Sequence, residues 1–256
     1  MKNKNTFILS MGIACAVCVG FGIAYSVRHQ KIKQFKENVG ELPMNFTCTA
    51  HTGCMGTVDN SIESIEQAVA SGAEIVEFDL NFTKSGEPVL AHDSPVGGEV
   101  TLDEAFKKIS EYDSIKVNVD IKSTDNLPIV KTLAEKYNLS DRIFFTGVND
   151  GFLDAVRTYG NNVPYYLNVD VKPIKEHNAV YLQMLVDKVK QSGAIGINFN
   201  KSNATADLVN AFHSNGLLVS IWTVDDKSNM YRIISFKPDN ITTRKPDKLK
   251  KIIDEL

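Results

Sequence analysis

Hydrophobic and polar positions follow two alternating periods along most of this chain. Short runs rich in β-branched and aromatic residues predict strands, and the longer runs between them, apolar at every third or fourth position, predict amphipathic helices. The predicted strands cover residues 45–50, 75–81, 116–122, 142–146, 163–168, 194–199, 217–223 and 240–243. The predicted helices begin near residues 61 and 101 and then cover 127–137, 150–159, 177–191, 205–215, 227–236 and 247–256.

This order of elements predicts the fold class. Eight strand–helix pairs in succession are typical of a (β/α)8 TIM barrel. Residues 87–92 are expected to be extended, and Thr101-Leu102-Asp103-Glu104 has the pattern of a capping box that opens a helix. A doubly wound open sheet is the alternative. No G-x-G-x-x-G or G-x-x-x-x-G-K-[ST] motif follows the first strand, which disfavours a nucleotide-binding version of that sheet.

The N-terminal segment is apolar and differs from the rest of the chain. Residues 5–27 carry no charge, and a membrane-spanning helix needs about 20 apolar residues. We therefore expect a single-pass membrane anchor at 1–27, a basic linker at 28–41 and a barrel domain at 42–256. A cleaved signal peptide is the alternative, since Ala24-Tyr25-Ser26 is an acceptable cleavage site. The sequence does not decide on which side of the membrane the barrel lies.

The charge distribution limits the class of partner. The formal net charge is −3, yet residues 1–40 carry six basic residues and one acidic residue. The barrel region is therefore clearly acidic, and we expect no nucleic-acid partner, because phosphate backbones require stripes of Lys and Arg.

Two cysteines, Cys48 and Cys54, flank the end of the first strand. A disulfide between them is possible, but small buried thiols are the favoured interpretation.

Three carboxylates are expected at the tops of two neighbouring strands. Glu77 and Asp79 share one face of the second strand because side chains alternate with period 2. Asp120 and Lys122 share a face of the third. Buried acids in such proximity require a compensating cation, and oxygen ligands suit Ca²⁺ or Mg²⁺. The alternative is a buried ionic network in which Lys122 neutralises the acids.

Two of the five histidines are expected beside these acids, His51 at the end of the first strand and His92 after the extended segment. Imidazoles exchange protons near neutral pH, so the pair could serve the attack on a phosphoryl ester and the departure of its alcohol. Lys122 would then face the phosphate.

These residues carry a family resemblance over about residues 46–247. The motifs are His51-Thr52-Gly53, Asp59-Asn60-Ser61, the block from Glu77 to His92-Asp93, Asp120-Ile121-Lys122 and Trp222-Thr223-Val224-Asp225. The chain resembles the glycerophosphodiester phosphodiesterase family, within the wider group of barrel phosphodiesterases that includes the phosphatidylinositol-specific phospholipases C.

The resemblance implies a hydrolase that splits a small or lipid-derived glycerophosphodiester into an alcohol and glycerol 3-phosphate. It implies acid–base roles for His51 and His92 and metal ligation by Glu77, Asp79 and Asp120. It also implies phosphate contact by Lys122 and a place for Trp222 in the substrate pocket.

The chain departs from the family pattern at several positions. Thr52 stands where the family has arginine, and its hydroxyl would offer the phosphate one neutral hydrogen bond in place of a bidentate charged one. Asp120 replaces glutamate, and Asp225 replaces asparagine and would add a negative charge near the rim. Arg244 replaces an acid and would supply a cation if it reaches the mouth.

The loss of the arginine leaves two other functions open. One is a barrel that binds phosphodiesters or lipid head groups without efficient turnover. The other is a related phospholipase or lyase that releases a cyclic phosphate.

Overall fold

The strands predicted from the alternation form a closed barrel in the computed structural model, which describes residues 30, 33–35, 41–160, 162–173 and 178–256. Within these residues eight parallel strands pair in a ring, and the pairing of the first with the second closes it. This closure excludes the open doubly wound sheet. The strands are β1 (Thr47–Ala50), β2 (Ile75–Phe82), β4 (Lys116–Ile121), β5 (Ile143–Val148), β6 (Tyr165–Asn168), β7 (Gly196–Asn200), β8 (Leu218–Trp222) and β9 (Asn240–Thr243).

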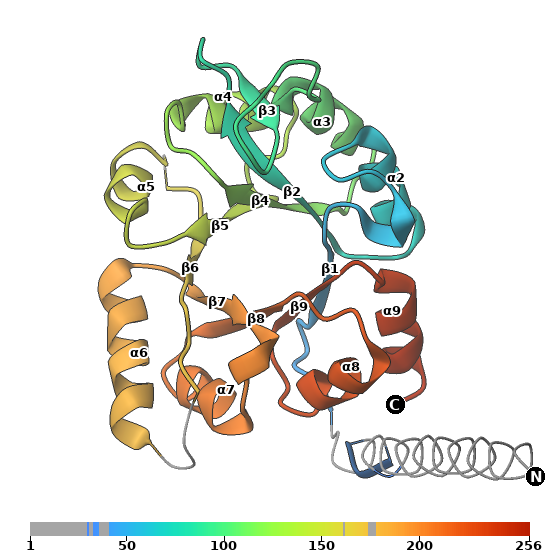
Figure 1. The fold of residues 1–256 in the computed structure, drawn as a ribbon, viewed down its shortest axis with the longest axis vertical. Helices are drawn as coiled ribbons and strands as arrows, with labels where there is room; N and C mark the ends of the chain where they lie inside the picture. Colours follow the sequence, from blue (N-terminus) through green and yellow to red (C-terminus); the bar gives the residue numbers. More distant parts are fainter. Residues whose placement is uncertain (1–29, 31–32, 36–40, 161, 174–177) are drawn as a thin grey trace, which may run out of the picture.

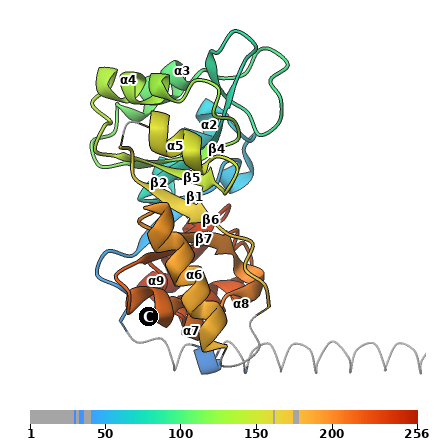
Figure 2. The same cartoon turned by 90° about the vertical axis from the view of Figure 1, so that its left-hand side faces the viewer.

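Helices surround the ring of strands, as Figure 1 shows along the barrel and Figure 2 from the side. They are α2 (Ile62–Ala70), α3 (Leu102–Ile109), α4 (Pro128–Lys136), α5 (Leu153–Tyr159), α6 (Ala179–Ser192), α7 (Ala206–His213), α8 (Lys227–Ile234) and α9 (Pro246–Asp254). Two short 3-10 turns, η1 (Cys54–Gly56) and η2 (Lys201–Asn203), follow β1 and β7.

The core lies between strands and helices, as the period-2 pattern requires. On β4, Val117 and Val119 are fully buried on the helix side, while Asn118 and Asp120 line the barrel mouth. On β2, Phe78 packs against Phe106 of α3 with ring centroids 6.3 Å apart. Apolar packing on one face of each strand thus directs the polar side chains of the other face inward.

One extra strand extends the sheet beside β2. The segment expected to be extended forms β3 (Pro88–Leu90), which pairs antiparallel with β2. The capping box is confirmed: the Thr101 hydroxyl accepts a hydrogen bond from the Glu104 amide at 3.2 Å, and the Glu104 carboxylate accepts one from the Thr101 amide at 2.9 Å. β3 and α3 therefore hold the loop that begins at Ala91.

The helix after the fourth predicted strand begins three residues later than predicted. We expected the helix after the fourth strand to begin at residue 150, but α5 begins at Leu153 and β5 extends to Val148. The Asn149 side chain accepts a hydrogen bond from the Gly151 amide at 2.8 Å, and this turn occupies the positions expected to be helical.

Cys48 and Cys54 are buried free thiols, which confirms the favoured interpretation. Burial raises the pKa of the Cys48 thiol above its ordinary range.

Among the described residues, the structure contains no helix with the length and apolar content needed to span a bilayer. The predicted anchor at 1–27 lies outside the described residues.

Candidate active site

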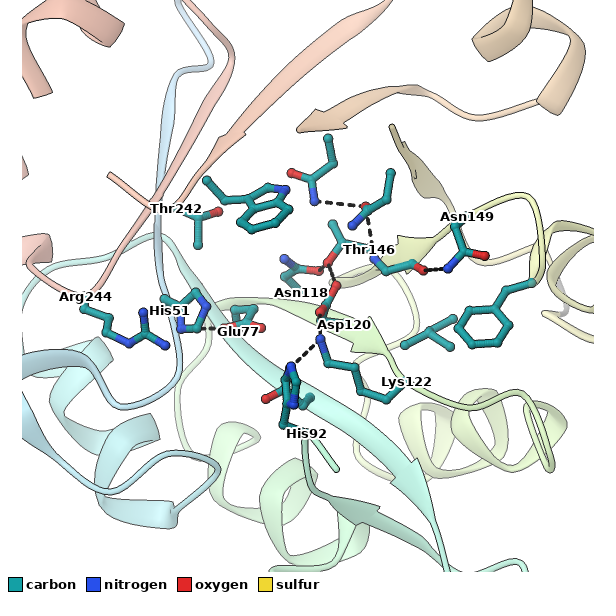
Figure 3. A pocket seen from close by; sticks show the side chains of 17 residues that line it. His51, Glu77, His92, Asn118, Asp120, Lys122, Thr146, Asn149, Thr242 and Arg244 are labelled. Atoms are coloured by element: carbon teal, nitrogen blue, oxygen red, sulfur yellow. Dashed lines mark hydrogen bonds and ion pairs between the residues drawn. The ribbon is translucent and has the colours of Figure 1, made fainter. Parts of the chain in front are cut away.

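A cavity of about 410 Å³ opens at the carboxyl ends of the strands (Figure 3). In a (β/α)8 barrel this is the end at which catalytic residues gather. The cavity brings together seven of the eight predicted site residues, the exception being Thr52. Its lining comprises His51, Glu77, Asp79, His92, Asn118, Asp120, Ile121, Lys122, Thr146, Gly147, Asn149, Phe152, Asn168, Asn198, Trp222, Thr242 and Arg244.

The three predicted carboxylates form one cluster in this cavity. Glu77, Asp79 and Asp120 each offer an oxygen, and these atoms lie within 4.8 Å of one another. The strand register places Asp79 directly beside Asp120. Burial raises the pKa of Glu77 well above its ordinary value, and the charges of Asp79 and Asp120 raise it further. A cation among the three oxygens would offset the burial and mutual repulsion of these charges, so the cluster suits a divalent metal with oxygen ligands.

Thr52 supports this cluster through hydrogen bonds and does not line the cavity. Its amide donates a hydrogen bond to Glu77 Oε2 at 2.7 Å, and its hydroxyl accepts one from the Asn60 amide at 2.5 Å. The side chain is 2% exposed. In this structure the hydroxyl contacts Asn60 and Thr52 lies outside the cavity lining, so a phosphate contact by this residue stays a prediction.

A tight turn after His51 makes this arrangement possible. Gly53 has φ 69°, and a Cβ there would lie 2.0 Å from Asp59 Oδ1. Only glycine fits such a position without displacing the Asp59 carboxylate. The turn carries the chain from β1 to the segment that contains Asn60.

Lys122 is held by two of the acids. Its Nζ lies 3.0 Å from Asp79 Oδ1 and 2.5 Å from Asp120 Oδ2. Burial lowers the pKa of this lysine, but the Asp120 and Asp79 carboxylates outweigh burial and raise it above the ordinary value. The ionic network considered from the sequence thus exists for two acids. The lysine expected to face a phosphate is, in this structure, directed toward the carboxylates.

His51 is fixed in one tautomer by its neighbour. Its Nδ1 lies 2.9 Å from the Thr52 carbonyl oxygen, which can only accept, so Nδ1 carries the proton and Nε2 has a free lone pair. Burial lowers the pKa of the imidazole, against the hydrogen bond to Thr52, and the nearby positive charge of Arg244 also lowers it. Neutral His51 is therefore suited to accept a proton.

His92 reaches the cavity because β3 leads the chain back to β2. The amide of Ala91 donates to the Asp79 carbonyl at 3.1 Å, which fixes the residue before the histidine. His92 Nδ1 lies 2.9 Å from Asp93 Oδ1, and the side chain is 69% exposed. The Asp93 carboxylate therefore orients the ring through Nδ1 and leaves Nε2 available to a ligand in the cavity.

Arg244 reaches the mouth of the cavity, a question that the sequence left open. In Figure 3 its side chain lies beside His51, on the side opposite Glu77. Asp225 was expected near the rim, but it does not line the cavity. Its Oδ1 accepts hydrogen bonds from the Arg244 amide at 2.7 Å and the Thr243 hydroxyl at 3.2 Å. This carboxylate therefore stabilises the backbone after β9.

Three side-chain amides, those of Asn149, Asn168 and Asn198, form another part of the cavity wall. They were not predicted from the sequence. Asn198 Nδ2 donates to Asn168 Oδ1 at 3.0 Å, and that oxygen also accepts from the Gly147 amide at 3.1 Å. Asn149, Asn168, Asn198 and Trp222 also line a second cavity of about 520 Å³. The wall between the two cavities is thus neutral and polar.

Gly147 connects this wall to the acids. Its φ is 74°, and a Cβ there would lie 2.4 Å from the Ile121 carbonyl oxygen and 2.9 Å from Asp120 Oδ1. The neighbouring Thr146 hydroxyl lies 2.6 Å from Asp120 Oδ1 and 2.8 Å from Asn118 Oδ1, and it donates its single proton to one of them at a time.

Solved structures share this fold. A glycerophosphodiester phosphodiesterase from Parabacteroides distasonis superposes with a TM-score of 0.68 at 20% identity, covering 84% of this chain and 99% of that protein. A phosphodiesterase from Oleispira antarctica, solved in complex with the product sn-glycerol-3-phosphate, gives 0.67 at 19% identity, covering 83% of this chain and 97% of that one. At these identities the likeness establishes the barrel alone.

Sequence comparison extends the likeness beyond the fold. The chain is 26% identical over 230 residues to a glycerophosphodiester phosphodiesterase of Caldanaerobacter subterraneus subsp. tengcongensis, covering 78% of this chain and 94% of the relative. The model of the glycerophosphoryl diester phosphodiesterase family matches residues 42–110 and 96–248. Because these matches span the described barrel almost from end to end, the chain belongs to the glycerophosphoryl diester phosphodiesterase family.

Proposed function

We propose that this protein is a metal-dependent hydrolase that splits glycerophosphodiesters into an alcohol and glycerol 3-phosphate. One observation carries the proposal: three carboxylates within 4.8 Å of one another share a cavity with two histidines that follow different strands. Family membership supports the same chemistry, and the relative from Oleispira antarctica holds sn-glycerol-3-phosphate as its product.

We assign the metal to Glu77, Asp79 and Asp120. Carboxylate oxygens suit Ca²⁺ or Mg²⁺, and the buried, mutually repelling acids favour a cation between them. When bound, such an ion polarises a phosphoryl oxygen and stabilises the charge that develops on it. Asp79 and Asp120 would release Lys122 in part, since they cannot serve both cations fully.

His51 and His92 take the proton-transfer roles in this proposal. Neutral His51, with a free Nε2, accepts the proton of the attacking water. His92, paired with Asp93, gives a proton to the departing alcohol oxygen. His51 follows β1 and His92 follows β3, so the two imidazoles enter the cavity from different segments, which supports separate roles in attack and departure.

Substrate contacts complete the assignment. With a metal on Asp79 and Asp120, the Lys122 ammonium would be available to the phosphate, and Trp222 provides an aromatic surface for the glycerol or the alcohol. The second cavity behind Asn149, Asn168 and Asn198 gives room for a neutral, hydroxylated alcohol. In this assignment Thr52 positions Glu77 and Asn60 through its hydrogen bonds and makes no contact with the substrate.

The test is hydrolysis of a diester panel by the full-length chain in detergent. Glycerophosphoglycerol, glycerophosphocholine and glycerophosphoinositol are each supplied with Ca²⁺, Mg²⁺ or EDTA. We expect release of glycerol 3-phosphate that EDTA abolishes and that His51→Gln and His92→Gln remove. Turnover of no diester with any metal would reject the proposal and leave a binding function. A cyclic phosphate in the phosphorus NMR spectrum would reassign the protein as a lyase.

We further propose that residues 1–27 anchor the barrel domain, 42–256, at a membrane through the basic linker 28–41. The uncharged run from residue 5 to 27 supports this. Alkaline extraction of cell membranes tests it. The full-length chain, with its N-terminus intact by mass spectrometry, should remain in the membrane pellet, whereas a chain beginning at residue 42 should not. A mature protein that starts after Ser26 would instead indicate a cleaved signal peptide.

A further inference from the structure

Arg244 is the first residue after β9, and its backbone is held on both sides. Its amide donates to Asp225 Oδ1 at 2.7 Å, and its carbonyl accepts from the Met55 amide at 3.1 Å. The side chain is half-buried, lines the cavity and lies beside His51 in Figure 3. The guanidinium therefore extends into the site from a fixed base.

Within the described residues, the Arg244 guanidinium has no hydrogen-bond or ion-pair partner. Lys122 and Arg244 are the lysine and arginine side chains that line the cavity in the described part of the chain. Lys122 is engaged by Asp79 and Asp120. Arg244, in contrast, makes no side-chain hydrogen bond or ion pair with any described residue, because Asp225 contacts only its backbone amide. A half-buried, unpaired cation in a cavity of acids calls for an anionic ligand.

The charges in the cavity indicate which anion fits. Three carboxylates carry three negative charges, and Lys122 and Arg244 carry two positive ones. A divalent cation on the acids brings the total to one positive charge, which a phosphodiester monoanion neutralises. Without Arg244 the same assembly would retain one negative charge after substrate binding, so the arginine completes the electrostatic match.

We propose that Arg244 binds a non-bridging oxygen of the substrate phosphate and is the anion-binding residue on the His51 side of the cavity. The inference rests on the proposed function, which supplies the phosphodiester. Two N–H groups of a guanidinium can contact a phosphate in a bidentate manner, which the Thr52 hydroxyl, bound to Asn60, cannot do. In this proposal the guanidinium that contacts the phosphate, together with Lys122, follows β9 and does not come from the turn after β1.

Calorimetric titration of sn-glycerol 3-phosphate into the metal-loaded, full-length protein tests the proposal. Arg244→Met keeps the length and apolar stem of the side chain but removes its charge, and we expect binding to weaken about tenfold to a hundredfold. Arg244→Lys, which keeps the charge without the bidentate geometry, should fall between that variant and the wild type. Metal affinity, titrated separately, should not weaken in either variant, whereas loss of folding would weaken it.

Lys245→Met is the matched control, since it removes the same formal charge one residue later from a side chain that does not line the cavity. It should bind glycerol 3-phosphate like the wild type. Wild-type affinity in Arg244→Met would overturn the proposal, as would a metal-loaded wild type that binds no glycerol 3-phosphate.

Parallel hydrolysis assays separate this inference from the proposed function. If the wild type binds glycerol 3-phosphate through Arg244 but hydrolyses no diester, the anion site stands and the proposed hydrolase does not. If the wild type hydrolyses diesters and Arg244→Met has an unchanged KM, the hydrolase stands and the anion site is overturned.

Discussion

Asn60 and Asp79 are joined by two reciprocal hydrogen bonds. Asn60 Nδ2 donates to Asp79 Oδ2 at 2.9 Å, and the Asp79 amide donates to Asn60 Oδ1 at 2.9 Å. One side chain thereby fixes both the backbone and the carboxylate of a proposed metal ligand. Partners that orient a ligand in this way contribute substantially to metal affinity.

We expect Asn60→Gly to weaken metal binding about tenfold to a hundredfold, because the orienting side chain is lost. Glycine is the suitable replacement, since Asn60 has φ 57° and other side chains would add backbone strain. Calorimetric titration of Ca²⁺ and Mg²⁺ measures the change. Asn81→Gly, on the same strand as Asp79 but outside the cavity, is the control. Equal metal affinity in the two variants would contradict the role of Asn60.

The Thr52 hydroxyl supports Asn60 in turn, so its removal should change the affinity for metal and not the affinity for phosphate. Thr52→Val keeps the shape of the side chain but removes the acceptor for the Asn60 amide. We expect weaker metal binding and an unchanged affinity for glycerol 3-phosphate at saturating metal. Thr52→Ser, which retains the hydroxyl, should behave like the wild type. A selective loss of glycerol 3-phosphate binding in Thr52→Val would mean that this hydroxyl contacts the phosphate after all.

Lys122 competes with a metal for Asp79 and Asp120, which predicts opposite effects of one substitution. Without metal, Lys122→Met removes the cation that pairs with the buried Asp79 and the partly buried Asp120. We expect a loss of about 1–3 kcal/mol, moderated because the lysine side chain is 22% exposed. This corresponds to a melting temperature lower by roughly 2–12 °C. With metal, the variant should show a larger thermal stabilisation than the wild type but slower hydrolysis.

Differential scanning calorimetry with and without Ca²⁺ measures both effects. Lys108→Met, which breaks surface pairs with Glu66 and Glu111, should lower the melting temperature only slightly. If metal stabilised Lys122→Met less than it stabilises the wild type, the proposed competition would be refuted.

The pH dependence of hydrolysis should report His51. Burial, together with the charge of Arg244, lowers the pKa of this imidazole, so it stays neutral to lower pH than a solvated histidine. As the base of the free enzyme, it should give kcat/KM an acidic limb with its midpoint below about pH 6.5. Activity would fall as pH decreases through that midpoint, because the protonated ring cannot accept a proton. A midpoint clearly above 6.5 would argue against His51 as the base.

The barrel and its acids could be predicted from the sequence because both depend on local patterns. Period-2 strands alternate with amphipathic helices, and Glu77 and Asp79 stand two residues apart where an apolar strand ends. The same logic placed Asp120, His51 and His92 in one cavity, as the structure has them.

The remaining features depend on closure of the ring or on backbone direction after a strand. Arg244 lies beside His51 only because β9 pairs with β1. Asn168 and Asn198 are single polar residues on different strands, and no local spacing relates them. Thr52 is the second residue after β1, where the alternation that predicts side-chain direction has ended.

The close approach at Gly147 restricts how this active site can change. Any side chain there would press on the Ile121 main chain and on the Asp120 carboxylate, so added bulk would reach the proposed metal before it reached a substrate. Asn149, Asn168 and Asn198 line the cavity proposed for the alcohol of the substrate, and none of them hydrogen-bonds to the acids. A directed-evolution library aimed at new leaving groups should therefore vary the amide wall and keep glycine at 147, where substrate range and metal binding cannot be adjusted independently.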